Sequence, residues 1–388
     1  MSKPLTSEHI DVADDAAAME YAWAHGWSDG LPIVPPTPER VAHFLDHAGL
    51  APSQLVGEYR VRNRGITAEK VAINAVMAGC KAEYLPVVLA ATEAVTDPAF
   101  RLNHIASTSS PWPAFIVNGP VTKAIGMNSG MYVLGPGNRA NATIGRAISL
   151  VLANCMEAKP GGVQQGIMGN AARMGGMVVA EKDDTAWGPL SAARGFEAGA
   201  NTVTGVSMWE GGPQQVVAFP AEHFPQGKQA EAFSAVLAEY LSDGYGGGGT
   251  DTVILSPIWH KVYLDEGWGR DDLRRYLESH VRTSVGRLKR RRRWIPGPGE
   301  QPTIAASAPL KPGDEERYYY PARDKEFDDG SGYERYSFRT AKRDSKERFL
   351  FAVAGGEAGQ GQPFACIIRA YDAGEPVTKR IRLPGESR

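Results

Sequence analysis

Apolar and polar positions alternate along this chain in a way that predicts helices and short buried strands in turn. Thr37 and Thr67 each precede a helical pattern as an N-cap, and Pro38 suits a first helical position. Helices are predicted at about 14–27, 38–45, 68–78, 83–96, 135–156, 228–241 and 270–281. Strands are predicted at about 114–118, 177–181, 202–207, 215–219, 252–255, 349–353 and 364–369. This order predicts an α/β fold, a mixed sheet with flanking helices and Pro/Gly-rich loops.

The composition changes at Arg287, where an Arg-, Pro- and Tyr-rich stretch begins. We therefore expect an α/β core at 1–286, an exposed insertion at 287–346, and C-terminal strands at 347–388 that return to the core. The basic run Lys289–Arg293 lacks interleaved aromatic residues, so a solvated loop is favoured over a nucleic-acid contact.

The overall composition narrows the class of protein. Of 388 residues, 43% are hydrophobic and 22% charged, which excludes whole-chain disorder, and the net charge of −2 gives no attraction to nucleic acid or membrane. No stretch is long and apolar enough to span a bilayer, and no signal peptide is recognised. The only cysteines, Cys80, Cys155 and Cys366, form no disulfide framework. A soluble cytoplasmic protein is expected.

Cys80 is the first candidate for chemistry, because it lies in the short junction between two predicted helices. A thiol facing the start of the second helix would have a lowered pKa, with Lys81 acting in the same direction. The carbonyl end of the preceding helix would act oppositely. The alternative is a small buried side chain that only packs.

The second candidate is the segment Gly135–Arg146, a Gly-rich turn that enters a helix. Arg139, Thr143 and Arg146 follow the spacing i, i+4, i+7 and should share one helix face, where a carboxylate or phosphate can bind. Asn138 and Asn141 lie beside them. The alternative is a solvated or ion-paired face.

Single polar residues complete the candidates. Asp29 stands in a Pro-rich loop as a base, a ligand or simply a turn residue. Asn118 ends a predicted strand, a usual site position in α/β folds, and Asn128 follows soon after. No HxH, HExxH or Cys/His spacing typical of zinc is present. His43 and His47 stand four apart on one predicted helix, a spacing that can bind metal, but surface histidines are favoured. No metal site is therefore predicted, and the sequence identifies no cofactor.

Four motifs together resemble a largely uncharacterised family of bacterial proteins. They are the segments 26–37 (GWSDGLPIVPPT), 72–80 with 83–86, 116–120 (IVNGP) and 135–146 (GPGNRANATIGR). The family resembles the large partner of small UGSC-motif (seleno)proteins, which are distantly similar to selenoprotein B of glycine and betaine reductases. The resemblance implies that the following residues occupy motif positions: Asp29, Glu69, Asn74, Cys80, Asn118, Asn128, Asn138, Arg139, Asn141 and Arg146.

Two functions are expected on these grounds. The first is an enzyme, a homo-oligomer that cleaves or adds at a carbon–sulfur or carbon–nitrogen bond of a small anionic substrate. In this enzyme Cys80 is the nucleophile or a thiol acid–base group, and Asp29 or Glu69 is its acid–base partner. Arg139 and Arg146 hold the carboxylate of the substrate. Asn118 and Asn128 would polarise a carbonyl. The second is a non-catalytic subunit that binds the substrate for a UGSC-type thiol or selenol redox protein.

Overall fold

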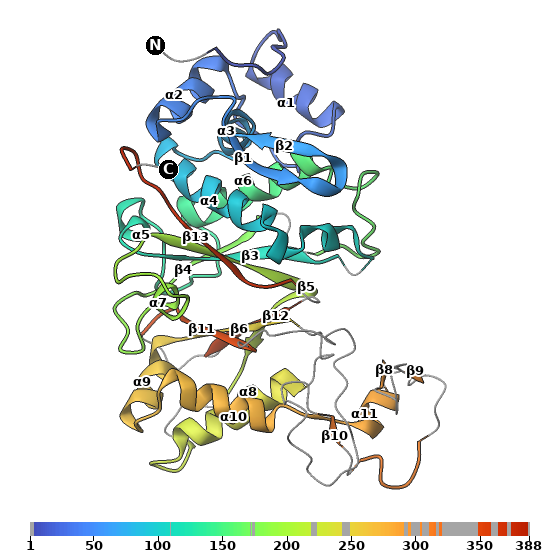
Figure 1. Ribbon diagram of the computed structural model, residues 1–388, viewed down its shortest axis with the longest axis vertical. Helices are drawn as coiled ribbons and strands as arrows, with labels where there is room; N and C mark the ends of the chain where they lie inside the picture. Colours follow the sequence, from blue (N-terminus) through green and yellow to red (C-terminus); the bar gives the residue numbers. More distant parts are fainter. Residues whose placement is uncertain are drawn as a thin grey trace. The chain divides into compact units, whose positions relative to one another are not determined.

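The chain divides into two compact units, each described below by itself. Unit 1 consists of Met1–Gly212, Ala354–Gly356 and Gly374–Arg388, and unit 2 of Pro213–Val353 and Glu357–Ala373. The structure is a computed structural model (Figure 1). It describes residues 4–108, 110–170, 172, 175–218, 223–242, 249–290, 294–295, 303–304, 310–315, 318–319, 348–357, 364–370 and 374–386.

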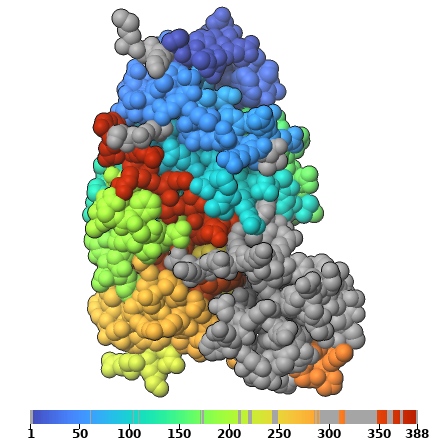
Figure 2. Space-filling view, viewed as in Figure 1, coloured from blue at the N-terminus to red at the C-terminus, as the bar shows by residue number. Residues whose placement is uncertain are grey.

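Unit 1 is built on a mixed sheet, as the sequence predicts. Its strands lie in the order β4–β3–β5–β13, where β3 and β4 are parallel while β5 is antiparallel to both β3 and β13. All seven residues of β3 are buried, which is typical of a central strand covered on both faces. The strands are β3 (Trp112–Asn118), β4 (Met177–Ala180), β5 (Thr202–Val216, of which the residues up to Gly212 belong to unit 1) and β13 (Val377–Arg380). The red C-terminal segment is exposed on the face of unit 1 seen in Figure 2.

Helices α4 and α6 pack against this sheet, and α3 packs on both of them (Figure 1). Helix α2 lies against α3. The helices of unit 1 are α1 (Asp15–Ala24), α2 (Pro38–Ala48), α3 (Ala68–Met77), α4 (Leu85–Thr96), α5 (Val121–Ala124), α6 (Arg139–Met156) and α7 (Leu190–Ala193). A small hairpin of β1 (Leu55–Tyr59) and β2 (Arg64–Thr67) precedes α3, and the 3₁₀ turns are η1 (Arg60–Arg62), η2 (Ala82–Tyr84), η3 (Pro98–Phe100) and η4 (Leu102–Ala106).

The helix starts follow the expected local chemistry. Thr37 and Thr67 accept hydrogen bonds from the backbone N–H groups of Arg40 and Lys70, so both caps are confirmed. Asn138 caps α6 in the same way. Gly79, at φ +85°, ends α3 in the left-handed conformation that glycine adopts most easily. These caps place Cys80 between α3 and η2, as predicted.

Unit 2 contains a second set of strands, β11–β6–β12, in which β11 is parallel and β12 antiparallel to β6. Its strands are β6 (Asp251–Leu255), β7 (Thr283–Ser284), β8 (Trp294–Ile295), β9 (Thr303–Ile304), β10 (Tyr318–Tyr319), β11 (Phe349–Val353) and β12 (Ala365–Ala370). Its helices are α8 (Gln229–Ser242), α9 (Pro257–Asp265), α10 (Arg270–His280) and α11 (Val285–Arg290). The C-terminal strands β11 and β12 are thus confirmed.

Two sequence expectations, on the strands after residue 202 and on the insertion at 287–346, have other outcomes. The two strands predicted at 202–207 and 215–219 are one strand, β5, so Gly211, Gly212 and Pro213 do not interrupt it. Most of the predicted insertion 287–346, including Arg291–Arg293 of the basic run, lies outside the described residues. Among the residues described, no helix is long and apolar enough to cross a membrane.

Candidate functional site

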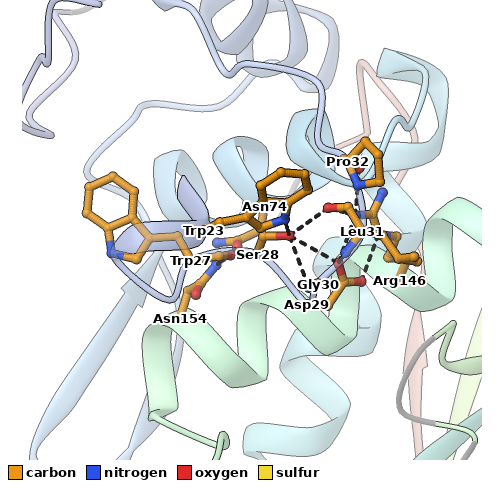
Figure 3. A network of polar contacts seen from close by, with 10 residues as sticks. All are labelled: Trp23, Trp27, Ser28, Asp29, Gly30, Leu31, Pro32, Asn74, Arg146 and Asn154. Atoms are coloured by element: carbon orange, nitrogen blue, oxygen red, sulfur yellow. Dashed lines mark hydrogen bonds and ion pairs between the residues drawn. The ribbon is translucent and has the colours of Figure 1, made fainter. Parts of the chain in front are cut away.

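The Pro-rich loop that carries Asp29 is clamped onto α6 by Arg146 (Figure 3). The guanidinium Nε and Nη2 atoms each donate to a different carboxylate oxygen of Asp29 at 2.8 Å. Nη2 also donates to the carbonyl oxygens of Leu31 and Pro32, at 3.3 and 2.9 Å. Such a bidentate pair is a strong, directional contact. The structure therefore brings two predicted site residues together, but as partners of each other.

The electrostatics of this pair keep Asp29 ionised. Burial by itself would raise the pKa of Asp29, but the hydrogen bonds and positive charge of Arg146 outweigh burial and leave the pKa below its ordinary value. Both side chains are largely shielded, with 13% and 14% of their surfaces exposed. A carboxylate held this way is poorly suited to accept or donate a proton near neutral pH.

Arg139 and Thr143 lie on the same face of α6 as Arg146, which confirms the spacing argument. Arg139 donates from Nε and Nη2 to the carbonyl oxygen of Gly79, at 3.0 and 2.9 Å. This carbonyl belongs to the end of α3, where backbone oxygens lack helical partners. Thr143 donates its hydroxyl to the carbonyl oxygen of Arg139 at 2.8 Å. Through the Arg139 contacts, this face of α6 is attached to the α3–η2 junction.

Cys80 lies in this same junction as a buried, neutral thiol. Its side chain is 6% exposed, and Sγ donates to the carbonyl oxygen of Thr143 at 3.3 Å. Burial raises the pKa of the thiol to about 12, although the hydrogen bond and the charges of Arg139 and Arg146 act in the opposite direction. The direction is the reverse of that expected for a reactive thiolate, because desolvation outweighs the nearby charges.

The candidate asparagines of the 126–141 segment form hydrogen bonds with backbone groups of the chain itself. Asn138 donates to the carbonyl oxygen of Gly126 at 2.8 Å while its own oxygen caps α6. Asn141 accepts from the backbone N–H of Asn128 and donates to its carbonyl oxygen, both at 3.0 Å. Reciprocal amide contacts of this kind fix loop conformation. The three asparagines lie together and shape the turn before α6, whereas the sequence led us to expect them to contact a substrate.

Asn118 joins two carboxylates that the sequence reasoning did not single out. Its Nδ2 donates to Glu181 at 2.5 Å and to Asp183 at 2.9 Å, at the carboxyl ends of the parallel strands β3 and β4. Glu181 and Asp183 also accept from the backbone N–H groups of Leu190 and Gly119. The available signal was the acidic residues directly after the second apolar strand. The hydrogen bonds of Asn118 run to this group and not to the Arg139 face.

Unit 1 contains a cavity of about 530 Å³ that sequence reasoning missed. One wall is an N-terminal segment, residues 5–12, which we call the strap. The other walls come from α1, the Pro-rich loop, α2, α3 and the end of α6. The sequence signal for this cavity was the presence of apolar residues in the strap, among them Ile10 and Val12. Apolar residues in a segment outside the predicted helices and strands indicate that the segment packs against another part of the chain.

Glu69 ties the strap to α3. Its side chain is fully buried, and its carboxylate accepts from Thr6 N at 2.9 Å, Thr6 Oγ1 at 2.7 Å and Ser7 N at 2.8 Å. Burial alone would raise the pKa of Glu69, but these hydrogen bonds outweigh burial and lower it. Glu69 is therefore the anchor of the strap and remains charged at neutral pH.

Substituting Glu69 with methionine is expected to release the strap. Thr6 and Ser7 would lose their acceptor, so their amides should exchange with solvent faster and the free energy of unfolding should fall by about 2–3 kcal/mol. Because the folded pKa of Glu69 is lowered, this contribution is present at neutral pH and lost as the pH falls below about 4. Hydrogen exchange and urea unfolding measure both effects.

The matched control is Glu39→Met, which removes a first-turn carboxylate from α2 instead of α3. It leaves the Glu69 contacts intact, so amide exchange at Thr6 and Ser7 should stay at the wild-type rate. Equal exchange in the Glu39→Met and Glu69→Met variants would contradict the anchoring role of Glu69.

Comparison of the chain with known protein families, curated proteins and solved structures finds no match. Within the part of the chain that the structure describes, no three His, Cys, Asp or Glu residues group as metal ligands would.

Proposed function

We propose that this chain binds a small organic molecule with an apolar body in the strap cavity. The volume of about 530 Å³ falls within the roughly 300–1,000 Å³ typical of small-molecule sites. The lining is drawn from six separate segments, and much of its apolar part comes from Ile10, Ile33, Val41, Ile73 and Met77. Such convergence of apolar side chains around an open space is the single observation that carries the proposal.

The state of the other candidate residues supports binding rather than covalent catalysis. Asp29 is paired with Arg146, Glu69 holds the strap, and Cys80 is a protonated thiol. A nucleophilic mechanism needs an activated nucleophile beside a free base. Of the two functions expected from the sequence, the binding subunit therefore agrees better with the contacts than the cysteine enzyme does.

A redox partner fits this proposal. All three thiols, Cys80, Cys155 and Cys366, are buried and free, so thiol or selenol chemistry on the ligand would be supplied by a second protein of the UGSC type. Free thiols also agree with a reducing, cytoplasmic location. Self-association is supported by the adjacent side chains of Ile167 and Met168, which are 82% and 94% exposed.

Binding of 1-naphthol, followed by titration calorimetry and by thermal unfolding, tests the proposal. Wild-type protein should show saturable binding and a rise in the unfolding temperature with ligand concentration. Ile73→Trp should remove binding, since the larger ring would fill the cavity from α3, where Ile73 is only partly buried.

Leu310→Trp is the matched control, because it introduces the same ring at an exposed position outside the cavity lining. It should bind 1-naphthol as the wild type does. Absence of saturable binding in the wild type, or equal binding in Ile73→Trp, would refute the cavity as the ligand site.

A further inference from the structure

We infer that the strap is the lid of the cavity: it opens to admit or release the ligand and closes again through the contacts of Thr6 and Ser7 with Glu69. This inference rests on the proposed function and adds how the ligand enters and leaves the site. The strap precedes α1 in unit 1 (Figure 1), and every strap residue except Thr6 lines the cavity. A segment that forms one wall of a binding cavity is placed to control access to it.

The strap is a wall only one chain thick. Leu5, Ser7 and Ile10 are half-buried, while the other strap residues are exposed to solvent. Solvent therefore lies on one side of the strap and the cavity on the other. A displacement of these few residues is enough to open the cavity.

The inner wall of the cavity scarcely reaches solvent while the strap is in place. Asn74, Met77 and Cys155 are only 3%, 3% and 9% exposed, although all three belong to the lining. Side chains packed this closely leave little room for an added molecule between them. A ligand that contacts the inner wall therefore requires one of the other walls to move.

The strap is held less firmly than the other walls. It adopts neither helix nor strand, and among the residues that the structure describes its only hydrogen bonds to the rest of unit 1 are those to the Glu69 carboxylate. The helical walls keep their own backbone hydrogen bonds, and four contacts of Arg146 hold the Pro-rich loop. Segments with few hydrogen bonds and few buried side chains open at the lowest cost in free energy. The strap is therefore the wall that moves.

The variant Thr6→Pro loosens the strap without changing the interior, since Thr6 is exposed whereas Glu69 is fully buried. Proline removes both the N–H and the hydroxyl of residue 6, which leaves the N–H of Ser7 as the remaining strap donor to Glu69. Ala13→Pro is the matched control. Ala13 is exposed, lies outside the cavity lining, and its N–H makes no hydrogen bond among the described residues.

Stopped-flow fluorescence of 1-naphthol binding to the full chain measures the effect on the lid. Thr6→Pro should raise the association and dissociation rate constants by the same factor, about tenfold, which is the scale for hydrogen bonds lost from a carboxylate. Because a lid controls both directions, the dissociation constant should stay unchanged. Ala13→Pro should keep both wild-type rates.

Two kinetic results would overturn the lid while leaving the cavity as the binding site. A raised dissociation rate alone, with weaker affinity, would mean that the strap contacts the ligand but does not control its entry. Wild-type rates in Thr6→Pro would mean that the ligand enters by another route.

Labelling of Cys155 tests the lid without any ligand. Cys155 lines the cavity, and its Sγ lies 3.9 Å from Nδ2 of Asn74, a second lining residue. An open strap exposes this thiol, so methyl methanethiosulfonate should label Cys155 about tenfold faster in Thr6→Pro than in the wild type or in Ala13→Pro, as measured by peptide mass spectrometry. Cys366, on β12 of unit 2, should label at one rate in all three proteins.

The labelling result separates this inference from the proposed function. Equal Cys155 rates in Thr6→Pro and wild type would overturn the lid, whatever the cavity binds. Faster Cys155 labelling in Thr6→Pro, together with no saturable binding of 1-naphthol by the wild type, would support the movement of the strap and overturn only the proposed ligand site.

Discussion

Replacing Arg146 with methionine is expected to lower the free energy of unfolding by about 3–5 kcal/mol, because it leaves a shielded carboxylate without its cation. Arg146 binds both oxygens of Asp29 and two carbonyl oxygens of the Pro-rich loop. The substitution removes all of these contacts at once. It should also loosen the loop, whose residues Ile33 and Pro35 form part of the cavity wall.

Urea unfolding at pH 7, followed by circular dichroism, measures this effect. The control is Arg64→Met, which breaks the pair between Arg64 and Glu157, whose side chains are 43% and 35% exposed. Solvent screens such a pair, so its loss should cost about 1 kcal/mol or less. Comparable shifts of the urea midpoint in the Arg64→Met and Arg146→Met proteins would show that the Asp29 pair is no stronger than a surface contact.

The same pair predicts a pH dependence with a definite sign. The pKa of Asp29 is lower in the folded chain than its ordinary value of about 3.9. The stabilisation from the Arg146 contact is therefore complete at neutral pH and lost as the pH falls through the folded pKa. The stability difference between wild type and Arg146→Met should shrink below about pH 4. A difference that is constant down to pH 2 would contradict the pairing.

Alkylation of Cys80 by iodoacetamide is expected to be very slow in the folded protein. A pKa of about 12, instead of about 8.5 for a free thiol, lowers the thiolate fraction at neutral pH by roughly three orders of magnitude. The thiolate is the reacting form, and burial restricts access further. Mass spectrometry of peptides, before and after unfolding in guanidinium, measures the rate at each cysteine separately.

Cys366 serves as the internal control for Cys80. It is buried on β12, and burial raises the pKa of its thiol to about 12 as well. Similar slow labelling of Cys80 and Cys366 would identify both as packing residues. Rapid labelling of Cys80 alone, with a pH midpoint below 8.5, would restore Cys80 as a nucleophile and contradict the geometry described above.

Local features of this protein were determined by its sequence. The N-caps Thr37, Thr67 and Asn138 and the terminating Gly79 act within a few residues, so their effect is readable from neighbouring positions. The shared helix face of Arg139 and Arg146 follows from helical periodicity alone. The mixed sheet followed from apolar runs that alternate with helical patterns.

Only the tertiary structure decided which partners these residues have. Asp29 and Arg146 are 117 positions apart in the sequence, and Glu69 and Thr6 are 63 positions apart. Neither contact therefore has a local signature in the sequence. The sign of the Cys80 pKa shift depended on desolvation, which is set by everything packed around the thiol. The cavity likewise arises where six segments converge, because the shape of an empty space is a property of their packing and not of any one segment.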